Sequence, residues 1–235
     1  MVTIYGKNVI KEALMANRKI YEAFILDSLL AKEKGIVDRI KGKNIKITVL
    51  NKIAMNNKFQ GNHQGFAANV EDYQYKDLAD CIDQAKKQCF IILDGLEDPQ
   101  NLGAILRTAD ATQMDGIIIP KNHSVSLNGT VAKVSVGAIE HVNMIQVNNL
   151  ARTIDELKEK GFWIIGTDMH GEKSYMDIDT SVSLAIIIGS EGFGMSRLVR
   201  EKCDYLVNVP MHGYVNSLNA SVTAALLMYE VLRKK

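Results

Sequence analysis

The stretch CFIILDGLEDPQNLG, residues 89–103, decides the expected fold class of this chain. An unbroken apolar run leads into a polar turn, and the turn leads into a helical pattern. Strands made almost entirely of Ile, Val and Leu are buried on both faces, which is typical of a parallel sheet covered by helices. Comparable runs, most of them separated by helical patterns, lie at residues 116–119, 143–147, 162–167, 184–189 and 205–209. We therefore expect an α/β domain with a parallel sheet and ligands at the carboxyl ends of its strands.

A smaller α/β pattern precedes this domain. Its expected helices are residues 8–16 and 28–40, and its expected strands are residues 22–27, 45–50 and 64–70. The polar stretch EDYQYKD then interrupts the pattern before the next apolar strand. The sequence therefore predicts a domain of residues 1–72, a linker of residues 73–87 and a second domain of residues 88–235.

The composition argues against several classes of protein. With 235 residues, 47% of them hydrophobic, the chain can fill a well-buried core. Its three cysteines are widely spaced and form no C-x-x-C pair, which argues against a disulfide framework and a zinc knuckle. The five histidines show no metal-binding spacing, so no metal is predicted. No signal peptide or membrane span is recognisable, and we expect a cytoplasmic protein that does not bind a membrane.

Positive charge is concentrated in the first domain. The formal net charge of the chain is +1, but residues 1–72 carry 12 Lys and Arg against 7 Asp and Glu. Six basic residues fall close together, namely Arg39, Lys41, Lys43, Lys46, Lys52 and Lys58. Such a cluster is the electrostatic footprint expected for binding a phosphate backbone. An ordinary solvated surface explains it equally well.

The helix that follows the opening stretch can be oriented from its sequence. Its apolar stripe, spaced i, i+3, i+4, i+7, faces the core and consists of Leu102, Ile105, Leu106 and Ala109. At about 100° per residue, Arg107 lies roughly 150° from the centre of this stripe and points away from the core. Arg107 then either pairs with Asp110 or reaches a phosphate, a partner subunit or a reacting hydroxyl, together with Asn101 at the helix start.

A second loop, GSEGFGMS at residues 189–196, is rich in glycine. It is not a Walker A loop, because Met195 stands where a lysine is required, and its glycine spacing does not match the dinucleotide fingerprint. The loop can bring its backbone close to a ligand while presenting one carboxylate, Glu191. A plain turn between a strand and a helix also explains the glycines.

A third loop, GYVNSLNAS at residues 213–221, leads into a C-terminal helix. Ser217 or Asn216 is expected as the N-cap, with Asn219 in the first turn. The expected apolar face of the helix consists of Leu218, Val222, Ala225, Leu226 and Tyr229. One cap needs a single oxygen, and two asparagines and a serine exceed that need. The surplus favours a bound ligand.

Taken together and in this order, the three loops resemble the three motifs of the SpoU-type (TrmH-like) RNA ribose 2′-O-methyltransferases of the SPOUT class. The matching segments are Asp98-Pro99-x-Asn101-x-Gly103 with Arg107, Gly189-x-Glu191-Gly192, and Ser217-Leu218-Asn219. In front of them, YGKNVIKEAL and NHQGFAA resemble the ribosomal-protein-L30e-like substrate-binding domain of bacterial 23S rRNA guanosine 2′-O-methyltransferases. The resemblance covers nearly the whole chain.

The resemblance implies a parallel α/β sheet with a C-terminal trefoil knot, preceded by a small L30e-like α/β domain. It implies the cofactor S-adenosylmethionine, bound by Gly189, Glu191, Gly192, Val209, Met211, Leu218 and Asn219. The residues implied in catalysis are Asn101, Arg107, Glu191, Ser217 and Asn219. The residues implied in RNA binding are Arg39, Lys41, Lys43, Lys46, His63 and Gln64.

The resemblance further implies a homodimer that methylates a guanosine ribose of 23S rRNA. Arg107 then acts either in the site of its own chain or across the interface in that of the partner. A tRNA ribose as substrate, or a catalytically silent ribosome- or RNA-binding protein of the same fold, are the alternatives. The reaction needs a group that accepts the hydroxyl proton or stabilises the oxyanion. Since arginine essentially never deprotonates, we expect Arg107 to stabilise the oxyanion and a phosphate, while the other motif residues position the ribose.

Overall fold

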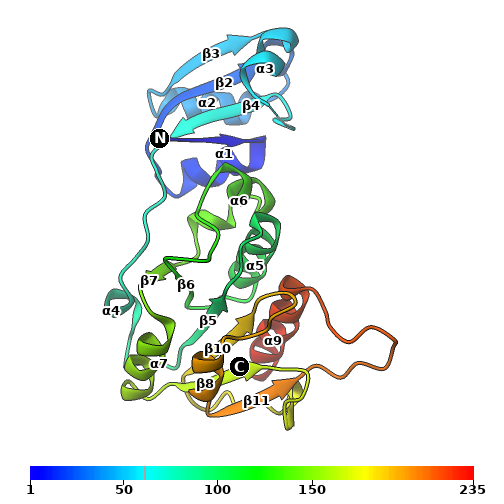
Figure 1. Cartoon of the computed structure of the whole chain (residues 1–235). Coiled ribbons are helices and arrows are strands. Elements are labelled where there is room, and N and C mark those ends of the chain that lie inside the picture. Colours follow the sequence, from blue (N-terminus) through cyan, green and yellow to red (C-terminus); the bar gives the residue numbers. More distant parts are fainter. Residues whose placement is uncertain (61) are drawn as a thin grey trace. The chain divides into compact units, whose positions relative to one another are not determined.

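The computed structural model describes residues 1–60 and 62–235. The chain divides into two compact units, which are described separately (Figure 1). The first unit contains Met1–Gln74 together with Ser126–His141, and the second contains Tyr75–Val125 together with Val142–Lys235. A segment from the middle of the chain therefore belongs to the same compact unit as the N-terminal residues.

The first unit is built on a four-stranded mixed sheet in the order β1-β4-β2-β3. β4 (Phe66–Val70) pairs antiparallel with β1 (Val2–Tyr5) and β2 (Ile20–Leu26), whereas β2 and β3 (Lys46–Leu50) run parallel. The accompanying helices are α1 (Lys7–Met15), α2 (Lys34–Gly42) and α3 (Lys52–Lys58). The core between sheet and helices contains the fully buried side chains of Ile4, Ile10, Ile25, Ile40 and Phe66.

Two parts of this unit differ from the sequence expectation. The helix expected at residues 28–40 begins only at Lys34, because the chain first makes the short 3-10 turn Asp27–Leu29 after β2. The sequence pattern also misses β1 and α3. A strand of 4 residues and a helix of 7 residues are too short to show a clear periodicity.

Residues 126–141 pack against the N-terminal residues of the same unit. α6 (Gly129–Val134) lies against β1, and the 3-10 turn Ala138–Glu140 lies against α1. Position 129 requires glycine, because a Cβ there would lie 2.2 Å from the carbonyl oxygen of Thr3. The buried apolar side chains of the segment are those of Val131, Ala132, Ala138 and Ile139.

A polar network holds the end of this segment. Arg18 forms an ion pair with Glu140 at 3.1 Å, and only 12% and 3% of these side chains are exposed. The Arg18 guanidinium also donates to the carbonyl oxygen of Glu71 and lies 3.6 Å from the centre of the Tyr73 ring. The Tyr73 hydroxyl donates to Glu140 at 3.1 Å. Burial and the neighbouring carboxylate raise the pKa of Tyr73 above its ordinary value, so the hydroxyl remains a donor.

The second unit is built on a seven-stranded sheet in the order β7-β6-β5-β10-β8-β11-β9, and every pair of neighbouring strands is parallel. The strands are β5 (Cys89–Asp94), β6 (Gly116–Pro120), β7 (Met144–Val147), β8 (Trp163–Thr167), β9 (Lys173–Ser174), β10 (Leu184–Gly189) and β11 (Tyr205–Asn208). The helices are α4 (Leu78–Cys81), α5 (Pro99–Ala111), α7 (Leu150–Glu159), α8 (Arg197–Glu201) and α9 (Ala220–Lys234). The predicted α/β fold with a parallel sheet is confirmed.

The two most apolar strands lie side by side near the middle of this sheet. β5 and β10 run in register from Cys89 opposite Leu184 to Asp94 opposite Gly189, and the first five residues of each are buried. The predicted core stripe of α5 is also confirmed, since Leu102, Ile105, Leu106 and Ala109 are all 0% exposed. β8 and β11 follow β10 in the sheet, so the carboxyl ends of these three strands are neighbours.

The C-terminal helix α9 packs against α5 and β10 (Figure 1). Its N-cap is Asn219 rather than Ser217 or Asn216. The predicted apolar face is wrong as well, because Val222 and Tyr229 are 46% and 53% exposed. The buried apolar residues of the helix are Ala220, Ala224, Leu227, Met228 and Val231. Apolar residues lie on more than one side of this helix, so periodicity alone does not select the buried side.

The connection from β11 to α9, residues 209–219, returns across the sheet. β11 lies beyond β8, whereas α9 packs on α5 and β10. Figure 1 shows this connection, in orange, projecting away from the sheet before it comes back to α9. The trefoil knot implied by the resemblance stays a prediction. No helix in the described part of the chain is long and apolar enough to cross a membrane.

Candidate functional site

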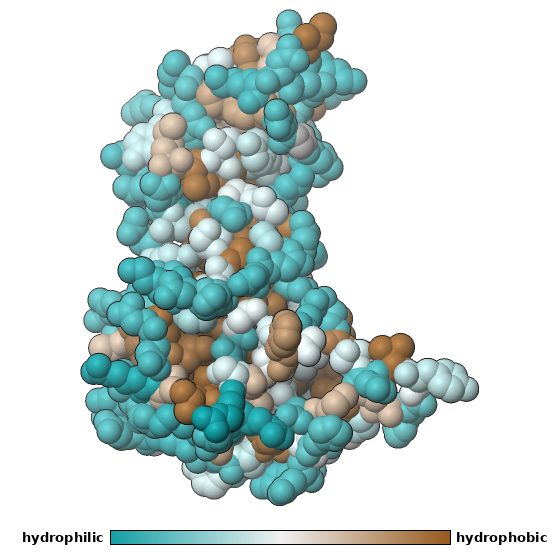
Figure 2. Space-filling view, in the orientation of Figure 1, coloured by the Kyte–Doolittle hydropathy of each residue, from teal (hydrophilic) through white to brown (hydrophobic). Residues whose placement is uncertain are grey.

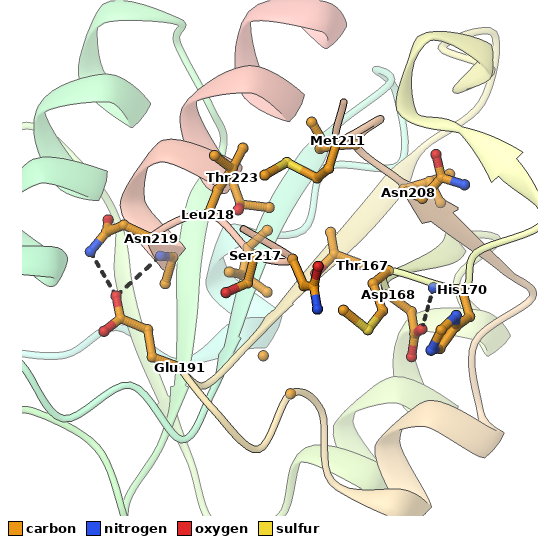
Figure 3. A pocket seen from close by; sticks show the side chains of 18 of the residues that line it. Thr167, Asp168, His170, Glu191, Asn208, Met211, Ser217, Leu218, Asn219 and Thr223 are labelled. Atoms are coloured by element: carbon orange, nitrogen blue, oxygen red, sulfur yellow. Dashed lines mark hydrogen bonds between the residues drawn. The ribbon is translucent and has the colours of Figure 1, made fainter. Parts of the chain in front are cut away.

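Three loops that are far apart in the sequence meet through their polar side chains. Asn101, in the first turn of α5, donates from Nδ2 to Oε1 of Glu191 at 3.0 Å. Asn219 donates from Nδ2 to the same Glu191 oxygen at 2.6 Å and to Oδ1 of Asn101 at 2.9 Å. Figure 3 shows the contact between Glu191 and Asn219. Each of the three loops singled out from the sequence therefore contributes one member of a closed triangle of side chains.

Local helix-start chemistry explains why two of these side chains are in place. Asp98 caps α5 by accepting from the N–H of Gln100 at 2.9 Å, and Pro99 follows where no N–H is needed. Asn101 is consequently fixed in the first turn and is only 6% exposed. Asn219 caps α9 with its Oδ1, which leaves Nδ2 to bridge the other two loops. One side chain thus serves as N-cap and as link.

The loop that carries Glu191 is a tight turn. Ser190 and Gly194 exchange backbone hydrogen bonds, each 3.0 Å long. Gly192 and Gly194 have φ angles of 89° and 67°, in the left-handed region that favours glycine. A Cβ on Gly189 would lie 2.3 Å from the backbone carbonyl carbon of Gly194. The glycines are therefore required by the turn itself, whatever else the loop contacts.

Within the described part of the chain, no cationic side chain compensates the charge of Glu191. Its Oε1 accepts hydrogen bonds from Asn101, from Asn219 and from the backbone N–H of Ala220, and all three donors are neutral. The peptide dipoles at the start of α9 favour a carboxylate at this place. Glu191 therefore combines a fixed position with an unpaired negative charge.

A pocket of about 1310 Å³ opens beside Glu191 and Asn219. It lies where β10, β8 and β11 end, which is the edge where parallel α/β sheets bind ligands. All of the residues that the resemblance implies in cofactor binding line the pocket, namely Gly189, Glu191, Gly192, Val209, Met211, Leu218 and Asn219. Ser217 lines it too. The structure therefore brings these predicted residues together at one concave site.

Arg107 does not line this pocket. It is exposed on α5, and its predicted direction away from the core is confirmed. The alternative pairing with Asp110 does not form, and within the described residues Arg107 has no ion pair at all. Its guanidinium is therefore available to a ligand or to a second chain.

The polar residues at the other end of the pocket stand in no recognisable sequence motif, namely Thr167, Asp168, His170 and Asn208 (Figure 3). Asp168 directly follows β8 and pairs through Oδ2 with Nε of Arg200 at 3.0 Å. Its Oδ1 accepts the backbone N–H of His170 at 2.8 Å. The signal that could have found Asp168 is its position, since an acidic residue directly after a buried parallel strand lies at the ligand-binding edge.

Large apolar side chains are exposed in two of the loops that contribute residues to the pocket. Phe193 is 94% exposed, and Tyr214 and Val215, in the connection to α9, are exposed as well. Figure 2 shows apolar surface on the loop that projects from the molecule at the right of the view. Exposed apolar side chains are typical of a contact surface where they lie close together.

The basic residues predicted to bind RNA differ in how available they are. Arg39 and Lys41 are exposed on α2, and among the described residues neither forms an ion pair. Lys43 donates at 2.8 Å to a backbone carbonyl near the end of α1. Lys46 pairs with Glu22 at 2.8 Å. Of these four residues, Arg39 and Lys41 are therefore the two whose charge is not used by an ion pair or hydrogen bond within the described part of the chain.

His63 and Gln64 lie in the turn that precedes β4. The Nδ1 of His63 accepts the backbone N–H of Gly65 at 2.9 Å, so the ring proton of the neutral side chain is on Nε2. That nitrogen lies 2.9 Å from Oδ1 of Asn56 and donates to it. Both nitrogens of His63 thus have partners inside the first unit, whereas Gln64 is exposed.

Cysteine and metal chemistry find no support among the residues that the structure describes. No group of His, Cys, Asp and Glu side chains there could hold a metal ion. Burial raises the pKa of Cys89 to about 12 and that of Cys203 to about 11. Both thiols are therefore protonated near neutral pH and do not act as thiolate nucleophiles.

Comparisons with known proteins agree with this arrangement. A family model described as the SpoU rRNA Methylase family matches residues 88–229, and one described as RNA 2'-O ribose methyltransferase substrate binding matches residues 3–76. A protein of Staphylococcus aureus named as a TrmH family tRNA/rRNA methyltransferase is 48% identical over 237 residues, which cover 99% of this chain and 96% of the relative. A Staphylococcus epidermidis protein of the same name is 47% identical, with 100% and 96% covered.

Solved structures have the same fold. The SpoU methyltransferase AviRb from Streptomyces viridochromogenes, crystallised with AdoMet, matches with a TM-score of 0.84 at 22% identity and covers 99% of this chain and 89% of its own. A structure described as an RNA 2'-O ribose methyltransferase matches with a TM-score of 0.80 at 25% identity, with 99% and 88% covered.

Proposed function

Because the chain belongs to the SpoU rRNA methylase family, we propose that it transfers a methyl group from S-adenosylmethionine to a ribose 2′-hydroxyl of RNA. The favoured acceptor is a guanosine of 23S rRNA. The observation that carries this proposal is the meeting of Asn101, Glu191 and Asn219 beside one pocket. Three loops of a methyltransferase would have to meet in this way to hold a methyl donor against a sugar.

The pocket suits the proposed donor in size and in chemistry. About 1310 Å³ exceeds what one drug-sized ligand needs, which leaves room for a donor and part of an acceptor nucleotide. Apolar residues such as Met211, Val209 and Leu218 offer a surface for a flat base, and polar groups stand at both ends. When bound, S-adenosylmethionine supplies an electrophilic methyl group carried by a sulfonium.

The protein's own contribution is alignment and electrostatic stabilisation. Mutual hydrogen bonds fix the side chains of Asn101, Glu191 and Asn219. Each of them can therefore position the reacting sugar. Ser217 lies in the same pocket wall and offers a hydroxyl. Because arginine essentially never deprotonates in proteins, Arg107 stabilises the developing oxyanion and a phosphate, rather than accepting the proton.

We further propose a homodimer in which Arg107 completes the site of the partner subunit. Two observations support this proposal. Arg107 is exposed and outside the pocket of its own chain. The outer side of α9 keeps Val222, Tyr229 and Leu232 exposed to 46%, 53% and 40%, an apolar surface suited to burial against a second copy.

The first unit is proposed to bind the RNA substrate, which agrees with the family model that matches it. Arg39 and Lys41 are the best candidates for phosphate contacts, because no internal ion pair competes for them among the described residues. RNA binding should then weaken steeply with salt, since each phosphate contact releases condensed counterions. The trefoil knot, the domain limits at residues 72 and 88 and a cytoplasmic location remain parts of this proposal.

The test is to supply labelled S-adenosylmethionine with unmodified 23S rRNA and, separately, with tRNA, and to map any 2′-O-methyl group. A mark on 23S rRNA supports the favoured substrate, and a mark only on tRNA replaces it. RNA binding without methyl transfer or donor binding would support a silent RNA-binding protein instead.

The Arg107→Lys variant tests whether the proposed role of Arg107 requires its guanidinium group or only a positive charge. Lysine keeps the charge but loses the planar fork, so we expect turnover to fall roughly hundredfold while donor affinity and thermal stability stay unchanged. Arg152→Lys, which changes another exposed arginine, on α7, is the control. Wild-type turnover by the Arg107→Lys variant would contradict this role.

A further inference from the structure

We infer that the donor lies in the pocket in one direction, with its ribose diol on Asp168 and its sulfonium toward Glu191. This inference rests on the proposed function, since it concerns the orientation of the same donor. It assigns a binding role to Asp168, a residue outside the three sequence motifs. The two carboxylates that line the pocket, Asp168 and Glu191, have different surroundings.

The two carboxylates stand at opposite ends of the pocket. Figure 3 shows Glu191 and Asn219 at one end, Asp168 and His170 at the other, and Ser217 and Leu218 between them. A ligand that spans the pocket therefore meets one carboxylate with each of its ends. S-adenosylmethionine has two chemically different ends, a methionyl part next to the sulfonium and a nucleoside.

The charge of Asp168 is already compensated. Arg200 Nε lies 3.0 Å from Oδ2, and the backbone N–H of His170 lies 2.8 Å from Oδ1. Only 21% of the Asp168 side chain is exposed. A cationic ligand group would have to compete with Arg200 for this carboxylate. A neutral group that donates hydrogen bonds would instead use lone pairs that Arg200 and His170 leave free, because each carboxylate oxygen accepts more than one hydrogen bond.

The charge of Glu191 has no such partner. Its described hydrogen-bond donors are two side-chain amides and one backbone N–H, and no cationic side chain of the described chain pairs with it. The attraction of a carboxylate for a cation falls with distance as described by Coulomb's law. The uncompensated carboxylate therefore favours the positive sulfonium, whereas the ammonium and carboxylate of the methionyl part largely cancel each other.

The nucleoside end of the donor matches Asp168 in hydrogen bonding. A ribose diol carries two neighbouring O–H donors and no charge, and hydrogen bonds from O–H groups to a carboxylate are of the strong, charge-assisted kind. An acidic residue after a parallel strand holds ribose in the same way in dinucleotide-binding folds. Asp168 is fixed for this task, because Thr167 beside it donates from Oγ1 to the carbonyl oxygen of Ile187 at 3.0 Å.

The competing assignment is that Asp168 holds the ammonium of the methionyl part. Two probes separate these assignments. S-adenosylhomocysteine contains both ends of the donor, while 5′-methylthioadenosine contains the nucleoside and lacks the ammonium. If Asp168 binds the diol, its replacement weakens both ligands by the same factor. If it binds the ammonium, only S-adenosylhomocysteine is affected.

The experiment is calorimetric titration of the full chain with both probes, using the wild type and the Asp168→Asn variant. Asparagine keeps an oxygen for the N–H of His170 and loses the charge, so we expect both affinities to fall by an equal factor of about ten to a hundred. Asp155→Asn is the matched control, because Asp155 also pairs with a cation, Lys202 at 2.6 Å, but lies outside the pocket. Its affinities should equal those of the wild type.

A change in the ligand keeps the test valid if the Asp168→Asn protein does not fold. The 2′,3′-dideoxy form of 5′-methylthioadenosine should bind the wild type about ten to a hundred times more weakly than the parent nucleoside. In a folded Asp168→Asn variant the same deletion should have little further effect, since the two changes remove one interaction.

Glu191→Gln tests the other end of the pocket. The amide oxygen still accepts the three neutral donors, but the negative charge is gone. We expect the affinity for S-adenosylmethionine to fall by about tenfold relative to S-adenosylhomocysteine, which has no sulfonium charge, and the affinity for 5′-methylthioadenosine to stay unchanged.

The inference is overturned if Asp168→Asn leaves both affinities intact, if it weakens only S-adenosylhomocysteine, or if the dideoxy ligand binds the wild type as well as its parent. It is also overturned if Glu191→Gln weakens the donor and its product equally. Each of these results leaves donor binding, and hence the proposed function, in place. If the wild type binds neither S-adenosylmethionine nor S-adenosylhomocysteine, the proposed function fails and the inference fails with it.

Discussion

Replacing Asn219 tests the link between the three loops, because its side-chain oxygen and its side-chain nitrogen make different contacts. The oxygen caps α9 through the N–H groups of Ser221 and Val222. The nitrogen bridges Glu191 and Asn101 at 2.6 Å and 2.9 Å. Asn219→Ala removes both functions, whereas Asn219→Ser keeps a good capping oxygen and removes only the bridge.

The expected magnitudes follow from these contacts. Loss of an N-cap costs about 1 kcal/mol of the free energy of unfolding. A hydrogen bond to a buried charged group contributes about 1.5–3 kcal/mol to the free energy of unfolding. Because Glu191 is exposed, we expect the contacts of the Asn219 nitrogen to contribute only about 1 kcal/mol. Asn219→Ala should therefore lose about 2 kcal/mol and Asn219→Ser about 1 kcal/mol. For a chain of this size, 2 kcal/mol corresponds to a fall of about 4–8 °C in Tm.

Urea unfolding and thermal melting of the full chain measure these differences. Asn219→Asp is a third comparison, because it keeps the cap but places a second carboxylate against Glu191. Two charges about 3 Å apart in water repel by about 1.4 kcal/mol, so this variant should be less stable than the serine variant. If Asn219→Ser and Asn219→Asp are both as stable as the wild type, the bridge contributes nothing and the reasoning is refuted.

Three further predictions concern other parts of the molecule. Arg18→Ala should lower the free energy of unfolding by about 3 kcal/mol, because it leaves the buried Glu140 carboxylate without its cation. Gly129→Ala should lower Tm, since the added Cβ would meet the carbonyl oxygen of Thr3 at 2.2 Å. Glu230→Gln should reduce stability at neutral pH but not in acid. Hydrogen bonding to Arg233 lowers the pKa of Glu230 from 4.5, so its contribution is complete above that value and is lost as the pH falls below it.

Matched controls distinguish these effects from general damage. Arg152→Ala breaks an ion pair whose arginine is 82% exposed, and it should change stability by less than about 1 kcal/mol. Gly35→Ala adds a Cβ with nothing within 4 Å and should be neutral or slightly stabilising. A wild-type Tm for Gly129→Ala, or a Glu230→Gln deficit that persists unchanged in acid, would show that the corresponding contact does not stabilise the protein.

The sequence predicts the second unit well where one physical effect dominates. β5 and β10 are apolar throughout, so their burial on both faces and the parallel sheet follow from composition alone. The stripe of α5 is equally clear, and it correctly directs Arg107 outward. In α9 two apolar sides compete, and the choice between Val222 and Leu227 depends on which neighbour the helix meets. That information is tertiary and cannot be read from periodicity.

Only half of the candidate site is visible in the sequence. Glu191 and Asn219 stand in unusually polar or glycine-rich loops, and this local composition is enough to single them out. Asp168 is one acidic residue after an ordinary strand, and its place in the pocket follows from the position of β8 between β10 and β11. Strand order in a sheet is set by crossover connections, which local pattern does not reveal.

The return of residues 126–141 to the first unit limits how substrate recognition can be transplanted between relatives. In a chimaera that exchanges only residues 1–74, the native Val131 and Ile139 would pack against a foreign surface. The Glu140 carboxylate would also lose its ion-pair partner, unless the other parent has an arginine at the position of Arg18. The unit that must be exchanged as a whole therefore consists of two separate segments, residues 1–74 and 126–141. Hybrid enzymes should therefore be most stable when both pieces come from the same parent.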